Sequence, residues 1–564
     1  MKRIKTLKSR SQETKQRRLP HLLLIVAVLT GGFLILLYFF NASDIPLQRT
    51  VDDPFILLTG RFEPDLNTAD PQNNGFRILF EAIGKNMFVK PPGDNRWTAL
   101  CERLGLDPDT VPQTTWLPLS AHLEKAYPKD GVPPENDYPP FQKQRMAERK
   151  MSTSPWTLEE FPFMKDWLET NAEALDKIVE AGRSDLFFQP KIRTSSTEPF
   201  LRILADSDRI AARELIGALL IRSLFRINDP ETADAAIDDA VAACRLGIHC
   251  SNSPWGLDRN PFAAEIALET VVELLRGDRL NAERLRRFAH EIDRFPRDPY
   301  TLEEVLDTGR YAALDLVDRL SRETIRRNDP LLEGAALPAA GKGEGIDWNR
   351  VAESVDRFFA ETAGIVGETN PITRDLLPEY PAAVARQKLA KSDWYLPSRS
   401  GRSEIAGDAI AFRCVYSPKL LAQYRERRQT RIHLLRLAVA LEQYRLEKGR
   451  YPETLALLEP KFIASVPGDP CLPPGTACHY VLEVSPNQPV TVDGANDGVN
   501  NGVSNGSNDG ANPDPSRYGY LLYSVWIDRS DDRGCVREEL MKKAYNGDVR
   551  VRMPSDEIIY RIPE

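Results

Sequence analysis

Residues 429–452 read QTRIHLLRLAVALEQYRLEKGRYP and constrain the architecture of this chain more strongly than any other segment. Up to Lys448 the apolar residues recur with the spacing of one helix face, and that face is unusually broad. It contains Ile432, Leu434, Leu435, Leu437, Ala438, Val439, Leu441, Tyr444 and Leu446. Gly449 is placed as a left-handed C-cap, and Pro452 prevents the helix from continuing. A face this broad must cover a sheet or several helices.

Two short strand-like runs follow this helix, at 479–484 and 518–527. Each is short and rich in aromatic and branched residues, which favours strands. The sequence therefore predicts one long helix packed on a small antiparallel sheet.

Several separate motifs in this region occur in the order found in the globular region of type II secretion pseudopilins and type IV pilin-like proteins. That family shares a helix ending YxxxxGxYP, a segment ending in Asp-Pro, and a strand YxLYSxGxDG. The matching positions here are Tyr444, Gly449, Tyr451, Pro452, Asp469, Pro470, Tyr520, Leu522, Tyr523, Ser524 and Asp528. Residues 429–535 thus resemble a pilin-like α+β domain. The whole chain also resembles membrane-anchored bacterial proteins that carry the same module, which implies an architecture and no activity.

The resemblance implies one metal site. Some pseudopilins bind calcium in the loop after the last motif, which corresponds here to Asp528, Asp531 and Asp532. Three carboxylates with nearby backbone carbonyls suit a cation that takes six to eight oxygen ligands. The alternative is a solvated acidic turn, because Arg529 and Arg533 lie beside these carboxylates. Calcium is the single cofactor that the sequence suggests.

The chain departs from a pseudopilin at its N-terminus. A pseudopilin's apolar helix begins after a peptidase site with a glycine before the cut and a glutamate shortly after it. Here the apolar run starts at Leu19-Pro20, has neither feature, and lies far from the pilin-like helix. We therefore interpret residues 429–564 as a pilin-like domain that is reused in a protein of a different kind.

Two further features distinguish the C-terminal region. Residues 491–516 contain tandem tetrapeptides with glycine at every fourth position, and these indicate a low-complexity insert between the strands. Cys471 and Cys478 flank a Pro-Pro-Gly loop and are predicted to form a disulfide, with Cys535 as an alternative partner for either.

The middle of the chain is predicted to be helical. Thr157 with Glu160 and Thr301 with Glu304 have the spacing of capping boxes. Helices are predicted over 209–226, 231–247, 262–275, 282–295, 348–363 and 382–391. In the first pair, Asp229 is the predicted N-cap and Pro230 the first helical residue. Consecutive antiparallel hairpins indicate a repeat-like array, and an irregular helical bundle is the alternative.

The N-terminus is predicted to anchor the chain in a membrane. Residues 1–18 carry a net charge of +7, residues 19–43 contain no charged side chain, and 22–40 is almost wholly apolar. About 22 helical residues rise roughly 33 Å, which matches a hydrocarbon core of about 30 Å. The positive-inside rule keeps the basic leader in the cytoplasm and places the bulk in the periplasm. A cleaved signal peptide is the alternative, although its apolar region is normally shorter.

The formal charge of −8 for 564 residues leaves an acidic body, which disfavours a nucleic-acid partner and favours proteins or cations. Apart from the bilayer at 19–40, we therefore expect protein partners. The predicted class is mainly α, with this division into segments: a basic leader 1–18, an anchor 19–43, a Pro-rich irregular or helical segment 44–155, a helical body 156–428 and a pseudopilin-like domain 429–564.

The sequence assigns no catalytic residue. The six histidines include no HExxH pair, and neither a GxSxG motif nor a dinucleotide-binding glycine motif occurs. The function predicted is that of an inner-membrane, single-pass, extracytoplasmic scaffold or interaction protein related to secretion or pilus assembly. Two alternatives stay open: an envelope hydrolase with a carboxylate pair in the helical body, and a cation-dependent structural module.

Overall fold

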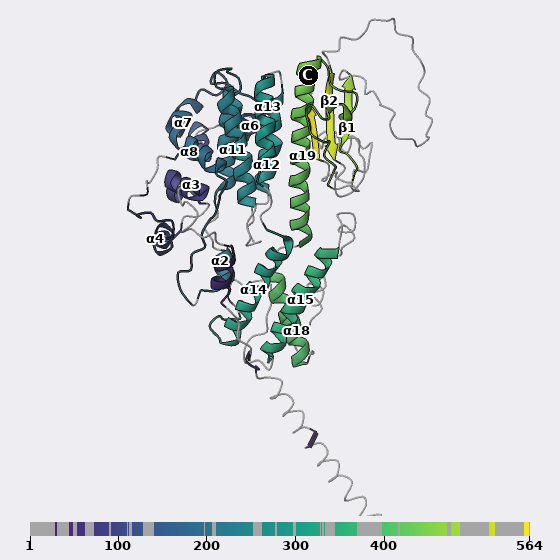
Figure 1. Ribbon diagram of the computed structural model, residues 1–564. Coiled ribbons are helices and arrows are strands. Elements are labelled where there is room, and N and C mark those ends of the chain that lie inside the picture. Colours follow the sequence, from purple (N-terminus) through teal and green to yellow (C-terminus); the bar gives the residue numbers. More distant parts are fainter. Residues whose placement is uncertain are drawn as a thin grey trace, which may run out of the picture.

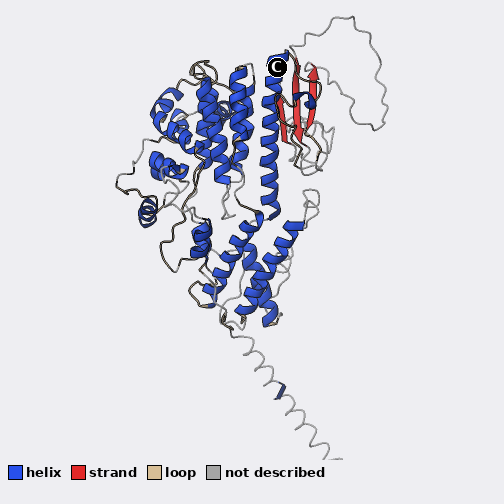
Figure 2. Cartoon of the chain, viewed as in Figure 1, coloured by secondary structure: helices blue, strands red, loops and turns tan. Residues whose placement is uncertain are grey.

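The computed structural model is mainly helical, as the sequence predicts (Figures 1 and 2). It describes residues 29–30, 44–48, 53–62, 73–88, 92–109, 111, 116–127, 140–196, 198–205, 210–251, 262–276, 279–296, 300–327, 329, 332, 345–368, 398–414, 418–470, 475–484, 518–524 and 558–562.

The elements follow the chain in this order: α2 (Pro54–Phe62), α3 (Gly75–Ile83), η2 (Gly84–Met87), α4 (Asp94–Arg103), α5 (Leu119–Ala126), α6 (Pro140–Thr153), α7 (Met164–Thr170), α8 (Ala172–Arg183), α9 (Phe200–Ala205), α10 (Ala212–Arg226), α11 (Ala233–Ser251), α12 (Phe262–Val271), η3 (Val272–Leu275), α13 (Ala282–Asp293), α14 (Leu302–Ser321), α15 (Trp348–Glu368), α18 (Arg399–Cys414), α19 (Pro418–Lys448), η5 (Leu455–Leu458), β1 (His479–Val484), β2 (Tyr518–Ser524) and β3 (Ile558–Ile562).

Helix α11 is the centre of the upper half of the molecule, where it packs against α8, α10, α12 and α13 (Figure 1). Small residues allow these close contacts. A Cβ added at Gly182 of α8 would lie 2.5 Å from the carbonyl oxygen of Ala242, and one at Gly247 would lie 2.8 Å from the Cα of Ala264. Neither distance is tolerated between real atoms, so both helix crossings require glycine.

Helix α19 lies between the helical layer and the sheet (Figure 1). One side contacts α12 and α13, and the other contacts β2 and β3. Residues 434–443 are therefore buried around the whole helix, with the single exception of Arg436. The broad apolar face read from the sequence thus covers both of the partners that it allowed, a sheet and a pair of helices.

We call α19, η5 and the three strands the C-terminal module. Its sheet is antiparallel in the order β1-β2-β3. His479 lies opposite Tyr523 in the first pair of strands, and Tyr520 lies opposite Ile562 in the second. The sequence predicts β1 and β2 but not β3. The predicted C-cap of α19 is confirmed, because Gly449 has φ +70° and donates its N–H to the carbonyl of Arg445 at 2.8 Å.

The buried apolar residues form two clusters. The first cluster joins residues 76–295 to the C-terminal module, so one core serves both parts. The second cluster is built by α14, α15 and α18, with α2 and α9 against it, and forms the lower half in Figure 1. Thr301 caps α14 with the reciprocal hydrogen bonds to Glu304 that the sequence predicts.

The segment 44–155, which the sequence predicts to be irregular or helical, contains the helices α2 to α6. Three details of the sequence-based prediction need correction. The second hairpin helix begins at Ala233, later than predicted, because Asp229 accepts the N–H of Glu231 in a turn. Thr157 and Glu160 do form reciprocal hydrogen bonds, but a turn follows and α7 begins at Met164. Helix α19 begins at Pro418, eleven residues before the predicted start.

Several predictions lie outside the described residues. Within the described ranges, no helix is long and apolar enough to cross a bilayer. Of the predicted anchor at 19–43, only Leu29 and Thr30 are described, and both are helical and exposed. The insert at 491–516 and the helix predicted at 382–391 also lie outside the described ranges.

Candidate functional site

The motif residues of the C-terminal module gather around a buried carboxylate on α19. Tyr451 donates its hydroxyl to Oε1 of Glu442 at 2.6 Å, and Arg445 donates Nε–H to Oε2 at 2.8 Å. The ring of Tyr520 meets the ring of Tyr451 edge-on, with 4.9 Å between centroids. Burial raises the pKa of Tyr451 and of Tyr520 above the ordinary value, so both phenols stay protonated and can only donate or pack. These residues fix the sheet on α19.

The other motif positions support the same packing. The motif residue Pro452 accepts the hydroxyl of Tyr480 at its carbonyl, at 2.8 Å, and this bond ties β1 to the turn after α19; Tyr480 itself is not a motif position. Leu522 and Ser524 are fully buried, and the backbone N–H of Asp469 donates to Thr476 at 2.8 Å. Sequence reasoning identified these positions by resemblance, whereas Glu442 was missed because a glutamate within a helix gives no signal of burial.

A row of ion pairs joins the helical layer to α19. Arg427 lies 3.4 Å from Glu265 of α12, Arg431 lies 2.5 Å from Glu269 one turn further along, and Arg436 lies 2.5 Å from Asp293 of α13.

The arginines of this row differ in burial. The Arg431 side chain is 4% exposed, although its partner Glu269 is 57% exposed, and the Arg436 side chain is 35% exposed. Burial raises the pKa of the Glu265 carboxyl, and the two arginines beside it oppose that effect. The row fixes the position of the C-terminal module on the helical layer, and we call it the junction.

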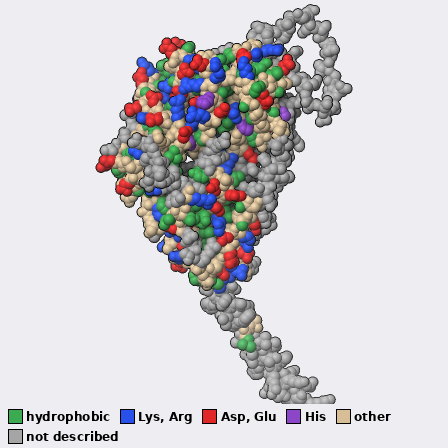
Figure 3. Space-filling model, in the orientation of Figure 1, with side chains coloured by type: hydrophobic (Ala, Val, Ile, Leu, Met, Phe, Trp, Pro, Cys, Tyr) green, Lys and Arg blue, Asp and Glu red, His purple; other side chains and the backbone are tan. Residues whose placement is uncertain are grey.

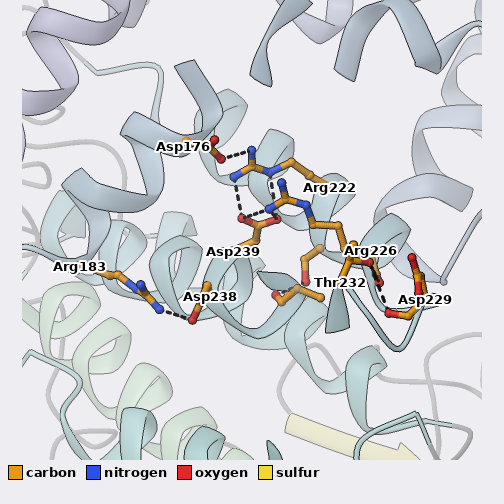
Figure 4. A network of polar contacts seen from close by, with 10 residues as sticks. Asp176, Arg183, Arg222, Arg226, Asp229, Thr232, Asp238 and Asp239 are labelled. Atoms are coloured by element: carbon orange, nitrogen blue, oxygen red, sulfur yellow. Dashed lines mark hydrogen bonds and ion pairs between the residues drawn. The ribbon is translucent and has the colours of Figure 1, made fainter. Parts of the chain in front are cut away.

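A second buried network holds α10 against α11 and α8 (Figure 4). Arg222 donates from Nε and Nη2 to both oxygens of Asp239, at 3.0 and 2.7 Å, and Arg226 approaches the same two oxygens. Arg222 also reaches the exposed Asp176 at 2.7 Å. Burial raises the pKa of Asp239, while both arginines favour its ionised form. All three nitrogens of the Arg222 guanidinium have a carboxylate acceptor, so this network has a structural role.

The upper face shown in Figure 3 gathers Lys and Arg side chains over α11 and α13. Many of them are paired. Arg284 and Arg287 contact Asp234, while Arg287 and Arg183 contact Asp238. On this face, arginine and aspartate side chains therefore neutralise one another in ion pairs. Such a polar surface suits contact with solvent or with another protein.

The structure brings together only part of the predicted site. Asp528, Asp531 and Asp532 lie outside the described residues, and so do Cys471 and Cys535. Cys478 is described and buried, and burial raises the pKa of its thiol to about 12. Among the described residues, no group of three or more His, Cys, Asp or Glu side chains is arranged to hold a metal ion. The calcium site and the disulfide stay predictions.

His249 is a buried histidine on α11. Its ring stacks on Phe187 with 5.3 Å between centroids, and Nε2 lies 3.2 Å from the carbonyl of Ser184. Burial, aided by the Arg245 guanidinium, lowers the pKa of His249 to about 4. Folding therefore favours the neutral ring.

This lowered pKa makes stability depend on pH. The folded-state pKa lies below the ordinary 6.5, so the unfolded chain binds the proton first, and stability falls as pH decreases from about 6.5 towards 4. His249→Gln is expected to reduce the acid-induced loss of unfolding free energy by about 2 kcal/mol between pH 7 and pH 5. Denaturant titrations at both pH values measure this loss, with the exposed His290→Gln as control. Equal pH dependence in all three proteins would refute the assignment.

Comparison with models of known protein families, with curated proteins and with solved structures finds no match to this chain.

Proposed function

We propose that this protein is a membrane-anchored scaffold or interaction protein, with its bulk outside the cytoplasm and a role in secretion or pilus assembly. In this proposal residues 19–40 hold the chain in the inner membrane. The body is a repeat-like hairpin array, and the C-terminal module is a pilin-like domain that faces protein partners.

The main support is the position of α19. Residues 434–443 of this helix are almost entirely covered by other parts of the chain. The junction adds three ion pairs to this contact. The helical body therefore presents the module in one fixed orientation, and a fixed orientation lowers the entropic cost of binding a partner.

Two leucines of the module are exposed. Leu446 near the end of α19 is 38% exposed, and Leu457 of η5 is 49% exposed. Single exposed leucines are common on protein surfaces, so these two residues serve as probe positions on the module and do not themselves define an interface.

Photo-cross-linking in native membranes tests the proposal. With p-benzoylphenylalanine in place of Leu457, we expect an adduct of one discrete mass that recurs between preparations, because a docked partner lies at a fixed distance. The matched control places the same probe at Met146 of α6, which is 58% exposed and lies outside the C-terminal module. We expect weaker or no adduct there.

Two results would contradict the proposal. One is the absence of a discrete adduct from both Leu446 and Leu457. The other is protection of the bulk of the chain when protease is added to spheroplasts, because a periplasmic body must be digested from outside.

A further inference from the structure

A pocket of about 480 Å³ lies between the two cores, in the size range of small-molecule sites. Helix α4 contributes one wall and belongs to the first core through Leu100 and Cys101. Helix α2 contributes another wall and belongs to the second core through Leu58. Residues 191–193, which connect the two halves, form the third wall. Boundaries between structural units are a common place for binding sites.

The lining is predominantly cationic, although the chain as a whole is acidic. Arg103, Lys191 and Arg193 contribute three positive charges, and Glu102 contributes one negative charge. Lys191 is only 6% exposed, so its ammonium group lies in an environment where charge interactions are stronger than in bulk water.

Arg193 is held in place by α2. Its Nη1 and Nη2 donate to the two oxygens of Asp53 at 2.5 and 2.8 Å, and its guanidinium lies 4.5 Å from the centroid of the Phe55 ring. The hydrogen bonds from Arg193 lower the pKa of Asp53. The Nε of Arg193 is buried and has no hydrogen-bond acceptor among the described residues.

The formal charges of the four charged lining residues and of Asp53, the partner of Arg193, sum to one positive charge. One excess charge suits a monoanion better than a doubly charged phosphate. Phe55 and Ile192 add apolar surface beside the charged groups. The ligand that fits these walls has one negative group and an apolar body.

We propose that this pocket binds a small monocarboxylate, with the carboxylate towards Lys191 and Arg103 and the apolar part against Phe55 and Ile192. A soluble organic acid and a fatty acid released from the membrane share this chemistry. Binding would also bridge the two cores, since the walls come from both.

Calorimetric titration of the full chain in lipid nanodiscs tests this proposal. The probes are benzoate for a soluble acid and octanoate for a fatty acid, with benzyl alcohol, octanol and inorganic phosphate as comparisons. We expect one or both carboxylates to bind at least about tenfold more tightly than the matching alcohol and than phosphate. Tighter binding of benzoate indicates a soluble acid, and tighter binding of octanoate indicates a fatty acid.

Variants locate the site. Arg103→Glu is expected to weaken carboxylate binding at least about tenfold, because it removes one attractive charge and adds a repulsive one. Arg103 lies in the last turn of α4 and is exposed, so the fold should persist. The matched control is Arg286→Glu, the same charge reversal at an exposed position of α13, and it should leave binding unchanged.

Lys191→Met is a second test, because Lys191 belongs to the wall formed by residues 191–193. It is expected to weaken carboxylate binding at least about tenfold as well. Circular dichroism checks that each variant keeps its helix content. The proposal is overturned if alcohols bind as well as acids, if phosphate binds more tightly, if no carboxylate binds at millimolar concentration, or if Arg286→Glu weakens binding as much as Arg103→Glu.

Discussion

Asp239→Ala is expected to lower the free energy of unfolding by about 3–5 kcal/mol, because it leaves the Arg222 guanidinium buried without its carboxylate. The Arg222 side chain is 3% exposed and that of Asp239 is 1% exposed, so water cannot replace the lost partner. Net stabilities of about 5–15 kcal/mol are typical, so this loss is a large fraction of the total. Denaturant unfolding followed by circular dichroism measures it.

Asp176→Ala is the matched control, since it deletes another carboxylate that contacts the same arginine at 2.7 Å. Asp176 is 68% exposed, and its removal should cost about 1 kcal/mol or less. The double variant Arg222→Met with Asp239→Leu should regain much of the stability, because neither charge then stays buried. Equal losses for the two aspartate variants would show that burial does not determine the effect.

Arg431→Glu is expected to have the second large effect, a loss of about 3–5 kcal/mol in the stability of the contact between α19 and α12. The substitution places a carboxylate beside Glu269, to which Arg431 is paired, and near the buried Glu265. Because this contact joins the C-terminal module to the helical layer, limited proteolysis should release a C-terminal fragment more rapidly than from the parent protein.

Arg436→Glu reverses the same kind of charge on the same helix, but the Arg436 side chain is 35% exposed. It should cost about 1 kcal/mol or less. Combining Arg431→Glu with Glu269→Arg should restore part of the lost stability, since the pair is re-formed with opposite polarity. If Arg431→Glu and Arg436→Glu cause the same loss of stability and the same rate of fragment release, the ion pairs do not determine how firmly the module is attached.

The candidate site follows from the sequence only in part. The resemblance to pilin-like proteins identified Tyr451 and Tyr520, which do meet in the structure, but not the Glu442 carboxylate that Tyr451 contacts. The junction gave no signal, because arginines and glutamates at helical spacing normally indicate a solvated face. Their burial depends on which helices pack together.

The local elements were determined by the sequence itself. The periodicity of 429–448, the glycine after it and the Thr301 capping box each act within a few residues, where spacing alone fixes the geometry. Tertiary structure alone decided that α19 is covered on both sides, that β3 completes the sheet, and that Asp53, Arg103 and Lys191 surround or support one pocket. These contacts join residues far apart in the chain. Their formation depends on the packing of whole elements, which a local pattern does not encode.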